Sequence, residues 1–284
     1  MHKTEKQVDD VINHVLTKNK DELNTALIEP IHKDWPFSSN GLYLLIGKPG
    51  SGKSFMLMKH ILMSEKLFEK PYYNRIIFCS TSSGLDKTVV SFLPKIKTPI
   101  TFVNDDKLLS FLRKHIKTKM KYYSIYRYVM NNFKKPEDEM KRIINKHGLT
   151  TKKRQIEYIA KKFNKYQTTR YPLNCLVVLD DFAGHPLLQR KESELCRIMT
   201  KCRHYNLTFC IAVQTPKFIL KNIKRMLTDL VVYKGVGEED FMDLVKEISH
   251  PWKNKELFEE YKKLTNPHSK MIFNLSADSY KIDN

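Results

Sequence analysis

Residues 47–54, with the sequence GKPGSGKS, combine three closely spaced glycines with a lysine and a serine. They fit the pattern GxxxxGK[ST], in which glycines let backbone N–H groups turn inward around a phosphate. In this pattern Lys53 reaches the β- and γ-phosphate oxygens, and the hydroxyl of Ser54 binds Mg²⁺. A strand-like apolar run before the segment and a helical pattern after it supply the context that a phosphate loop needs. We therefore predict a binding site for ATP and Mg²⁺ formed by Gly47, Lys48, Pro49, Gly50, Ser51, Gly52, Lys53, Ser54 and Phe55.

Two adjacent acids end a later apolar run, CLVVLDD. A nucleotide hydrolase needs a second anchor for its metal ion and a base for the attacking water. Asp180 is placed to hold Mg²⁺ and Asp181 to orient or deprotonate water, although glutamate is the commoner base in this class. The alternative is that both acids only end the strand and begin a turn.

Two further polar groups could complete the chemistry. Gln214 ends the apolar run LTFCIAVQ, and its amide could sense the γ-phosphate or position water; otherwise it is a turn residue before Pro216. An arginine from a neighbouring subunit often neutralises the charge that develops in phosphoryl transfer. Among Arg190, Arg197 and Arg203, we predict that Arg203 has this role, because it ends a helix just before the Gln214 strand. The alternative is a charge that stabilises a helix C-terminus.

Short apolar runs alternate with helical patterns along most of the chain. The runs lack internal polar alternation, which indicates strands buried on both faces and hence a mainly parallel sheet flanked by helices. The predicted fold class is α/β. We expect strands at 42–46, 75–80, 100–103, 175–181, 207–214, 229–235 and 270–276, and helices at 52–66, from 105, at 193–204, at 216–226 and on either side of Pro251.

The formal net charge of +19 predicts attraction to polyanions. It is concentrated in residues 107–170, which hold 19 Lys and Arg against 4 Asp and Glu, together with several tyrosines. We predict an N-terminal helical adaptor at 1–40 and a P-loop ATPase domain at 41–284 that carries this basic segment as a helical insertion. The insertion could contact DNA, meet an acidic portal or capsid protein, or be a solvated face around a small core of its own.

Composition also excludes several classes of protein. The five cysteines include no CxxC pair, and three lie in apolar runs, so we expect buried reduced thiols rather than a zinc site or a disulfide framework. No apolar run approaches the roughly 18–20 residues that span a bilayer, and the first ten residues lack the apolar stretch of a signal peptide. We therefore expect a soluble intracellular protein.

The phosphate loop, the run LVVLDD and the segment CRHYNLTFCIAVQ together resemble the genome-packaging ATPases of large DNA viruses and virophages, which are related to the poxvirus packaging ATPase and belong to the FtsK/HerA superfamily. The resemblance covers about 41–235 without the basic insertion. It implies a RecA-like domain, a homo-oligomeric ring, ATP hydrolysis that drives double-stranded DNA into a preformed capsid, and a capsid or portal partner. It also implies a location in the host-cell cytoplasm, at the viral factory, or in the virion. By position it assigns the roles given above to Lys53, Ser54, Asp180, Asp181, Gln214 and Arg203.

Other hypotheses remain open at this level. One alternative is a non-packaging member of the same superfamily, such as a conjugation, secretion or filamentous-phage assembly ATPase. Those proteins usually carry a membrane segment or an extra coupling domain, and neither is visible here. A nucleotide or nucleoside kinase also has a phosphate loop but has no use for the basic excess. A nucleic-acid binder that holds ATP only as a structural ligand would show no turnover.

Charge-neutral substitution of Lys152, Lys153 and Arg154 is expected to weaken DNA-stimulated ATP hydrolysis, because lysine and arginine gain affinity for DNA by releasing counterions. The loss should be largest at low salt. Turnover measured with long double-stranded DNA over a salt series tests this, and unchanged stimulation would reject DNA contact in that segment.

Overall fold

The computed structural model describes residues 37–38, 40–68, 71–81, 86–132, 174–190 and 193–284. The chain divides into two compact units. The larger unit, Ile28–Phe111 with Asn174–Asn284, holds the sheet; of the other, Met1–Leu27 with Leu112–Leu173, only 112–132 is described. The adaptor at 1–40 is almost wholly outside the described residues, and the insertion lies outside them beyond 132. Both stay predictions.

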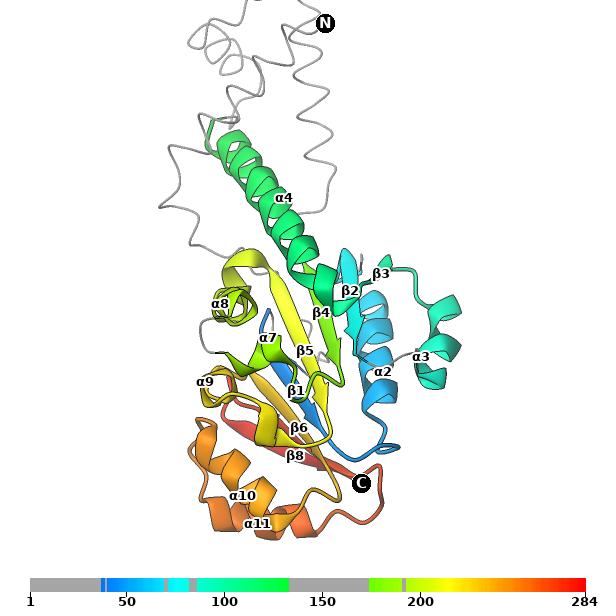
Figure 1. Cartoon of the computed structure of the whole chain (residues 1–284), viewed down its shortest axis with the longest axis vertical. Coiled ribbons are helices and arrows are strands. Elements are labelled where there is room, and N and C mark those ends of the chain that lie inside the picture. Colours follow the sequence, from blue (N-terminus) through cyan, green and yellow to red (C-terminus); the bar gives the residue numbers. More distant parts are fainter. Residues whose placement is uncertain (1–36, 39, 69–70, 82–85, 133–173, 191–192) are drawn as a thin grey trace, which may run out of the picture. The chain divides into compact units, whose positions relative to one another are not determined.

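The larger unit is built on an eight-stranded sheet with the order β3-β2-β4-β5-β1-β6-β7-β8 (Figure 1). From β3 to β6 all neighbouring strands are parallel, and β7 and β8 continue the sheet antiparallel. The mainly parallel sheet that the apolar runs predict is therefore confirmed. The strands are β1 (Leu42–Ile46), β2 (Arg75–Ser80), β3 (Ile100–Phe102), β4 (Cys175–Asp180), β5 (Leu207–Val213), β6 (Asp229–Tyr233), β7 (Lys270–Asn274) and β8 (Ser279–Asp283).

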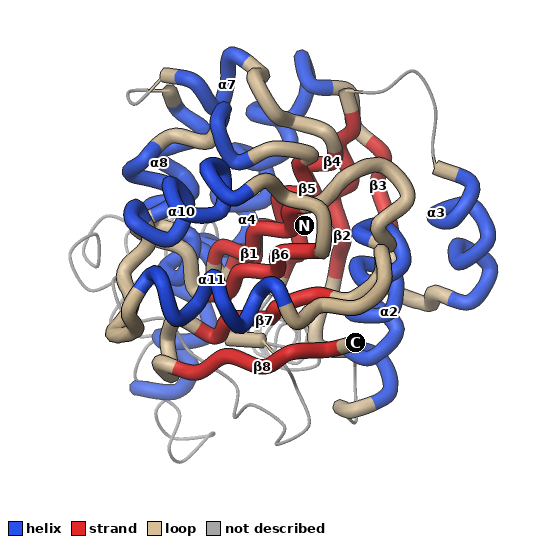
Figure 2. The backbone as a smooth tube through the Cα atoms, turned by 90° about the horizontal axis from the view of Figure 1, so that it is seen from below, coloured by secondary structure: helices blue, strands red, loops and turns tan. Residues whose placement is uncertain are grey.

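Helices cover both faces of this sheet. Figure 2 shows α2 on one side and α8 and α10 on the other. The core under α2 joins Leu57, Met58 and Ile61 to alternate residues of the strands, including Tyr43 and Val178. The helices are α2 (Lys53–Lys66), α3 (Lys87–Phe92), α4 (Asp105–Asn132), α7 (Pro186–Gln189), α8 (Glu194–Thr200), α9 (Lys221–Lys224), α10 (Glu238–Glu247) and α11 (Asn254–Lys262), with 3₁₀ turns η1 (Leu93–Lys95), η2 (Cys202–Tyr205) and η3 (Pro216–Phe218).

The strand order brings the predicted site residues to one edge of the sheet. β5 lies between β1 and β4, and all three run parallel, so their C-terminal ends meet. The phosphate loop follows β1, the two acids end β4, and Gln214 follows β5. Two backbone hydrogen bonds extend this register past the strands: Gly47 N–H donates to Val213 O at 3.2 Å, and Asp181 N–H donates to Ala212 O at 3.0 Å.

Two expected helices differ from the structure. The helix expected at 193–204 is α8, with its N-cap at Ser193, followed by η2. The single helix expected at 216–226 is wrong: η3 and α9 are separated by extended backbone at Ile219 and Leu220. Ile219 and Ile223 are both buried, while Phe218 is left 52% exposed. Strand β8 was not anticipated, because its sequence, SYKID, is mostly polar and exposed.

The expectation of buried reduced thiols is confirmed. All five cysteines are buried free thiols. Burial raises the pKa of the Cys175 thiol to about 12, so this thiol stays protonated and unreactive at neutral pH. Among the described helices, none is both long and apolar enough to cross a bilayer.

A buried carboxylate fixes the entry of the chain into the sheet. Asp229, at the start of β6, is 1% exposed, and both of its carboxylate oxygens accept from Ser38 N–H at 3.2 Å. The Tyr43 hydroxyl donates to the Ser38 carbonyl. Burial raises the pKa of Asp229 from 3.8 to about 7, although hydrogen bonds from Thr228 and Ser38 oppose this. The folded state therefore holds a proton here that the unfolded state has lost near neutral pH.

The wild type should become less stable as pH rises, and Asp229→Asn should not show this pH dependence. The folded pKa lies above the unfolded one, so the free energy of unfolding falls as pH rises through about 4 to 7. Three pKa units correspond to an upper limit on the order of 4 kcal/mol. Urea unfolding of both proteins at pH 5 and pH 8 checks this. The free energy of unfolding of the variant should rise relative to that of the wild type between pH 5 and pH 8. A difference that is the same at both pH values would contradict the assignment.

Candidate nucleotide-binding site

The phosphate loop adopts a backbone that side chains would obstruct. Gly52, the N-cap of α2, has φ 99°, in the left-handed region that favours glycine. A Cβ on Gly47 would lie 2.5 Å from Ser51 Oγ and 2.8 Å from Tyr233 Cβ, so only glycine lets the backbone approach these side chains. The loop therefore presents its main chain at the start of a 14-residue helix. Such a helix start favours anions.

One buried polar atom in the loop also fits an anion. Ser51 is 4% exposed, and within the described residues its hydroxyl has no hydrogen-bond partner. A buried hydroxyl without a partner costs free energy, and a phosphate oxygen would satisfy it. This observation, together with the loop backbone, fits the bound phosphates that the motif predicts.

Lys53 lies across the loop. Its Nζ donates to the carbonyls of Gly47 at 2.7 Å and Lys48 at 3.1 Å. Burial lowers the pKa of Lys53, while the carboxylates of Asp180 and Asp181 oppose that change. The ammonium is thus held beside the site by two weak acceptors, from which phosphate oxygens can displace it.

Asp180, the last residue of β4, and Asp181, which follows it, have different environments. Burial raises the pKa of Asp180, and the charge of neighbouring Asp181 raises it further, whereas Lys53 lowers it. Asp181 has φ 58°, which is uncommon for a residue with a Cβ. Its Oδ1 accepts from Gln214 Nε2 at 3.2 Å, and its carbonyl accepts from Thr81 Oγ at 2.8 Å. The predicted base and the predicted sensor are therefore in direct contact.

A pocket of about 1110 Å³ joins these groups. Most of the predicted site residues line it: Pro49, Gly50, Ser51, Gly52, Lys53, Ser54, Phe55, Asp180, Asp181 and Gln214. Gly47 and Lys48 do not line the pocket, and instead their carbonyls hold Lys53 beneath the loop.

Arg203 is not brought to this pocket. It lies in η2 before the N-terminal end of β5, whereas Gln214 follows the other end of that seven-residue strand, about 20 Å along the sheet. Its side chain is exposed, and its charge lowers the pKa of Asp229. A role for Arg203 in its own chain's pocket is excluded by this distance. Action on a neighbouring subunit stays a prediction.

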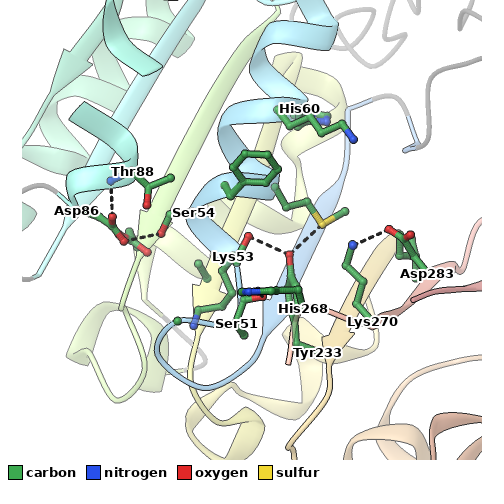
Figure 3. Close-up of a pocket in the computed structure, with 18 of the residues that line it drawn as sticks. Ser51, Lys53, Ser54, His60, Asp86, Thr88, Tyr233, His268, Lys270 and Asp283 are labelled. Atoms are coloured by element: carbon green, nitrogen blue, oxygen red, sulfur yellow. Dashed lines mark hydrogen bonds and ion pairs between the residues drawn. The ribbon is translucent and has the colours of Figure 1, made fainter. Parts of the chain in front are cut away.

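The structure adds Asp86, which sequence reasoning missed. Ser54 Oγ donates to Asp86 Oδ2 at 3.0 Å, and Asp86 Oδ1 accepts from Thr88 N–H at 2.7 Å as the N-cap of α3 (Figure 3). The Thr88 N–H bond is the largest cause of the lowered pKa of Asp86. The only signal in the sequence is an aspartate two residues before a threonine at a helix start, which predicts a cap but no site.

The oxygen donors fit Mg²⁺ as a partial ligand set. Ser54 and the carboxylates of Asp180 and Asp86 supply the hard oxygen ligands that this ion prefers. Among the described residues, no group of three or more His, Cys, Asp or Glu could hold a metal ion alone. Mg²⁺ is usually bound by one or two carboxylates together with nucleotide phosphates, so the triphosphate would complete the site.

Asp86→Ala should lower the free energy of unfolding by about 1 kcal/mol, because it removes the α3 cap and the acceptor for Ser54. Asp86→Asn is the matched control, since its side-chain oxygen can still accept from Thr88 N–H. Urea unfolding should place Asp86→Asn closer to the wild type. Equal losses for both variants would show that the cap does not carry the effect.

Residues 106–273 match the family model described as Poxvirus A32 protein. No curated protein sequence matches the chain.

Among solved structures, the genome packaging NTPase B204 of Sulfolobus turreted icosahedral virus 2 superposes with a TM-score of 0.50 in two complexes. The ATP-γS complex is 13% identical and the AMPPCP complex 12%, each over 87% of this chain and 98% of that one. EssC from Geobacillus thermodenitrificans is also similar, with a TM-score of 0.49 and 13% identity over 86% of this chain and 39% of that one.

At such low identity, the likeness to B204 shows a common α/β fold and no more. The family match is stronger, because it covers more than half of the chain and includes Asp180, Asp181 and Gln214. The chain belongs to the Poxvirus A32 protein family.

Proposed function

We propose that this protein is an ATP-hydrolysing motor that moves double-stranded DNA into a viral capsid. The observation that carries the proposal is the meeting of Lys53, Ser54, Asp180, Asp181 and Gln214 in one pocket at the C-terminal edge of the sheet. The solved relative B204 is described as a genome packaging NTPase and was bound to ATP-γS, which supports the same substrate here.

The chain's own groups can perform hydrolysis as follows. Loop N–H groups and the start of α2 hold the phosphates. Lys53 exchanges its bonds to the Gly47 and Lys48 carbonyls for β- and γ-phosphate oxygens. Mg²⁺, held by Ser54 and Asp180, would neutralise charge on the phosphates. Asp181 orients the attacking water and accepts its proton, while Gln214, which donates to Asp181 Oδ1, fixes that carboxylate and lies beside the reacting phosphate.

The charge of the chain supports DNA as the polymer that is moved. A motor has to hold phosphates without reading bases, and a basic surface does so by counterion release. The net charge of +19, with its excess in 107–170, fits that requirement. The complete assembly in this proposal is a homo-oligomeric ring, in which Arg203 reaches the neighbouring pocket, docked on a capsid or portal component in the host-cell cytoplasm.

Lys53→Ala should abolish nucleotide binding, whereas Asp181→Asn should bind ATP and lower turnover by about 10²–10⁴-fold, the usual contribution of a general base. Asp243→Asn, in an exposed ion pair on α10, is the matched control. Turnover is measured with and without long double-stranded DNA, together with the mass of the assembly. Wild-type turnover that DNA does not raise, or turnover retained in Asp181→Asn, would refute the mechanism.

A further inference from the structure

The pocket extends well beyond the groups that act on the terminal phosphate. Its other side is lined by residues of α2, β6, β7, β8 and the turn before β7, including Met56, Lys59, Tyr233, His268, Lys270 and Asp283. Figure 3 shows Tyr233, His268, Lys270 and Asp283 on one side of Lys53 and Ser54, and Asp86 and Thr88 on the other. Tyr233, His268 and the other side chains on the first of these sides have no part in the proposed hydrolysis.

This second side is fastened to the phosphate loop. The Tyr233 hydroxyl donates to Gly52 O at 3.1 Å and also contacts Met56 Sδ at 3.3 Å. His268 Nδ1 lies 3.2 Å from Ser51 O and donates to it, because a carbonyl can only accept. This side of the pocket therefore keeps a fixed position relative to the phosphate loop.

The strand order gives a bound triphosphate its direction. Along the edge, the sheet runs β4-β5-β1-β6-β7-β8. The two acids proposed to act on the terminal phosphate lie at the C-terminal end of β4, Gln214 follows β5, and the phosphate loop follows β1. The α-phosphate and everything attached to it must then point the opposite way, toward the ends of β6, β7 and β8 that meet at this edge.

The chemistry of that side suits a sugar and a base. Met56, Met63 and Ile272 supply apolar surface for a flat ring. Lys270 Nζ and Asp283 Oδ2 pair at 2.5 Å, with side-chain exposures of 18% and 52%. The Lys270 hydrogen bond lowers the pKa of Asp283, and the charges of Lys281 and Lys59 lower it further. A charged acceptor and a charged donor thus stand beside an apolar floor, as in small-molecule sites.

Resting on the proposed function, we propose that this side is the nucleoside subsite. Met56, Met63 and Ile272 contact the base, and the Lys270–Asp283 pair hydrogen-bonds the sugar hydroxyls and the base edge. The antiparallel strands β7 and β8, which extend the parallel sheet past β6, then have a function: they carry the two charged groups that recognise the nucleoside.

The test compares ATP with inorganic tripolyphosphate, which has the phosphates but no nucleoside, as calorimetric ligands in the presence of Mg²⁺. Asp283→Asn and Lys270→Met are expected to weaken ATP binding about tenfold or more, the loss typical of a charged hydrogen bond. Tripolyphosphate affinity should change less than about twofold, which also shows that each variant is folded. Asp243→Asn, in an exposed Lys–Asp pair on α10, should bind both ligands like the wild type.

Two results would overturn the subsite: ATP affinity unchanged in both variants, or equal losses for ATP and tripolyphosphate. In either case Lys53→Ala still reports on the proposed function, because it should lose both ligands. Conversely, a wild type that binds ATP through Asp283 and Lys270 but never hydrolyses it would refute the motor and retain the subsite.

Discussion

The hydrogen-bond register of three parallel strands is the constraint on which the site depends. Ile46 of β1 pairs with Val213 of β5, and Ala212 pairs with Asp180 of β4. A slip of one residue would move Asp180 by about 3.3 Å and turn its side chain to the other face of the sheet. Unbroken apolar sequences keep these strands buried on both faces, so the register is held by the core and not by the polar groups that it positions.

That register gathers charges of the same sign. The charges of Asp86, Asp180 and Asp181 oppose the lowering of the Lys53 pKa by burial. The charges of Asp86 and Asp181 also raise the pKa of Asp180. The single ammonium of Lys53 offsets only part of this repulsion. A triphosphate alone would add to it, whereas a triphosphate with its divalent cation would bring both an anion for the loop and a cation for the acids. The electrostatics thus favour joint binding of the nucleotide and its metal ion.

Sequence reasoning succeeded where one local pattern determines the structure. The apolar runs gave the parallel strands, and GKPGSGKS together with the acids after β4 gave one side of the pocket. It failed where tertiary packing decides. Ile219 and Ile223 are spaced like one helix face and are both buried, yet the backbone at Ile219 and Leu220 is extended.

The side of the pocket formed by β6, β7 and β8 was missed for a similar reason. Strand β8 is recognisable only as the partner of β7, since SYKID is mostly exposed. The approach of Lys270 and Asp283 to the phosphate loop depends on the order of strands that are distant in sequence. The position of Arg203 relative to its own pocket depends on the same order. None of these positions is encoded in a short pattern.

The left-handed backbone at Asp181 bears on the choice between aspartate and glutamate for the base that we propose. Its φ of 58° lies in a region where aspartate, asparagine and glycine are accommodated far better than residues with longer side chains. The turn after β4 therefore favours a residue with a short side chain at this position. The backbone conformation alone thus gives a reason for aspartate at this position.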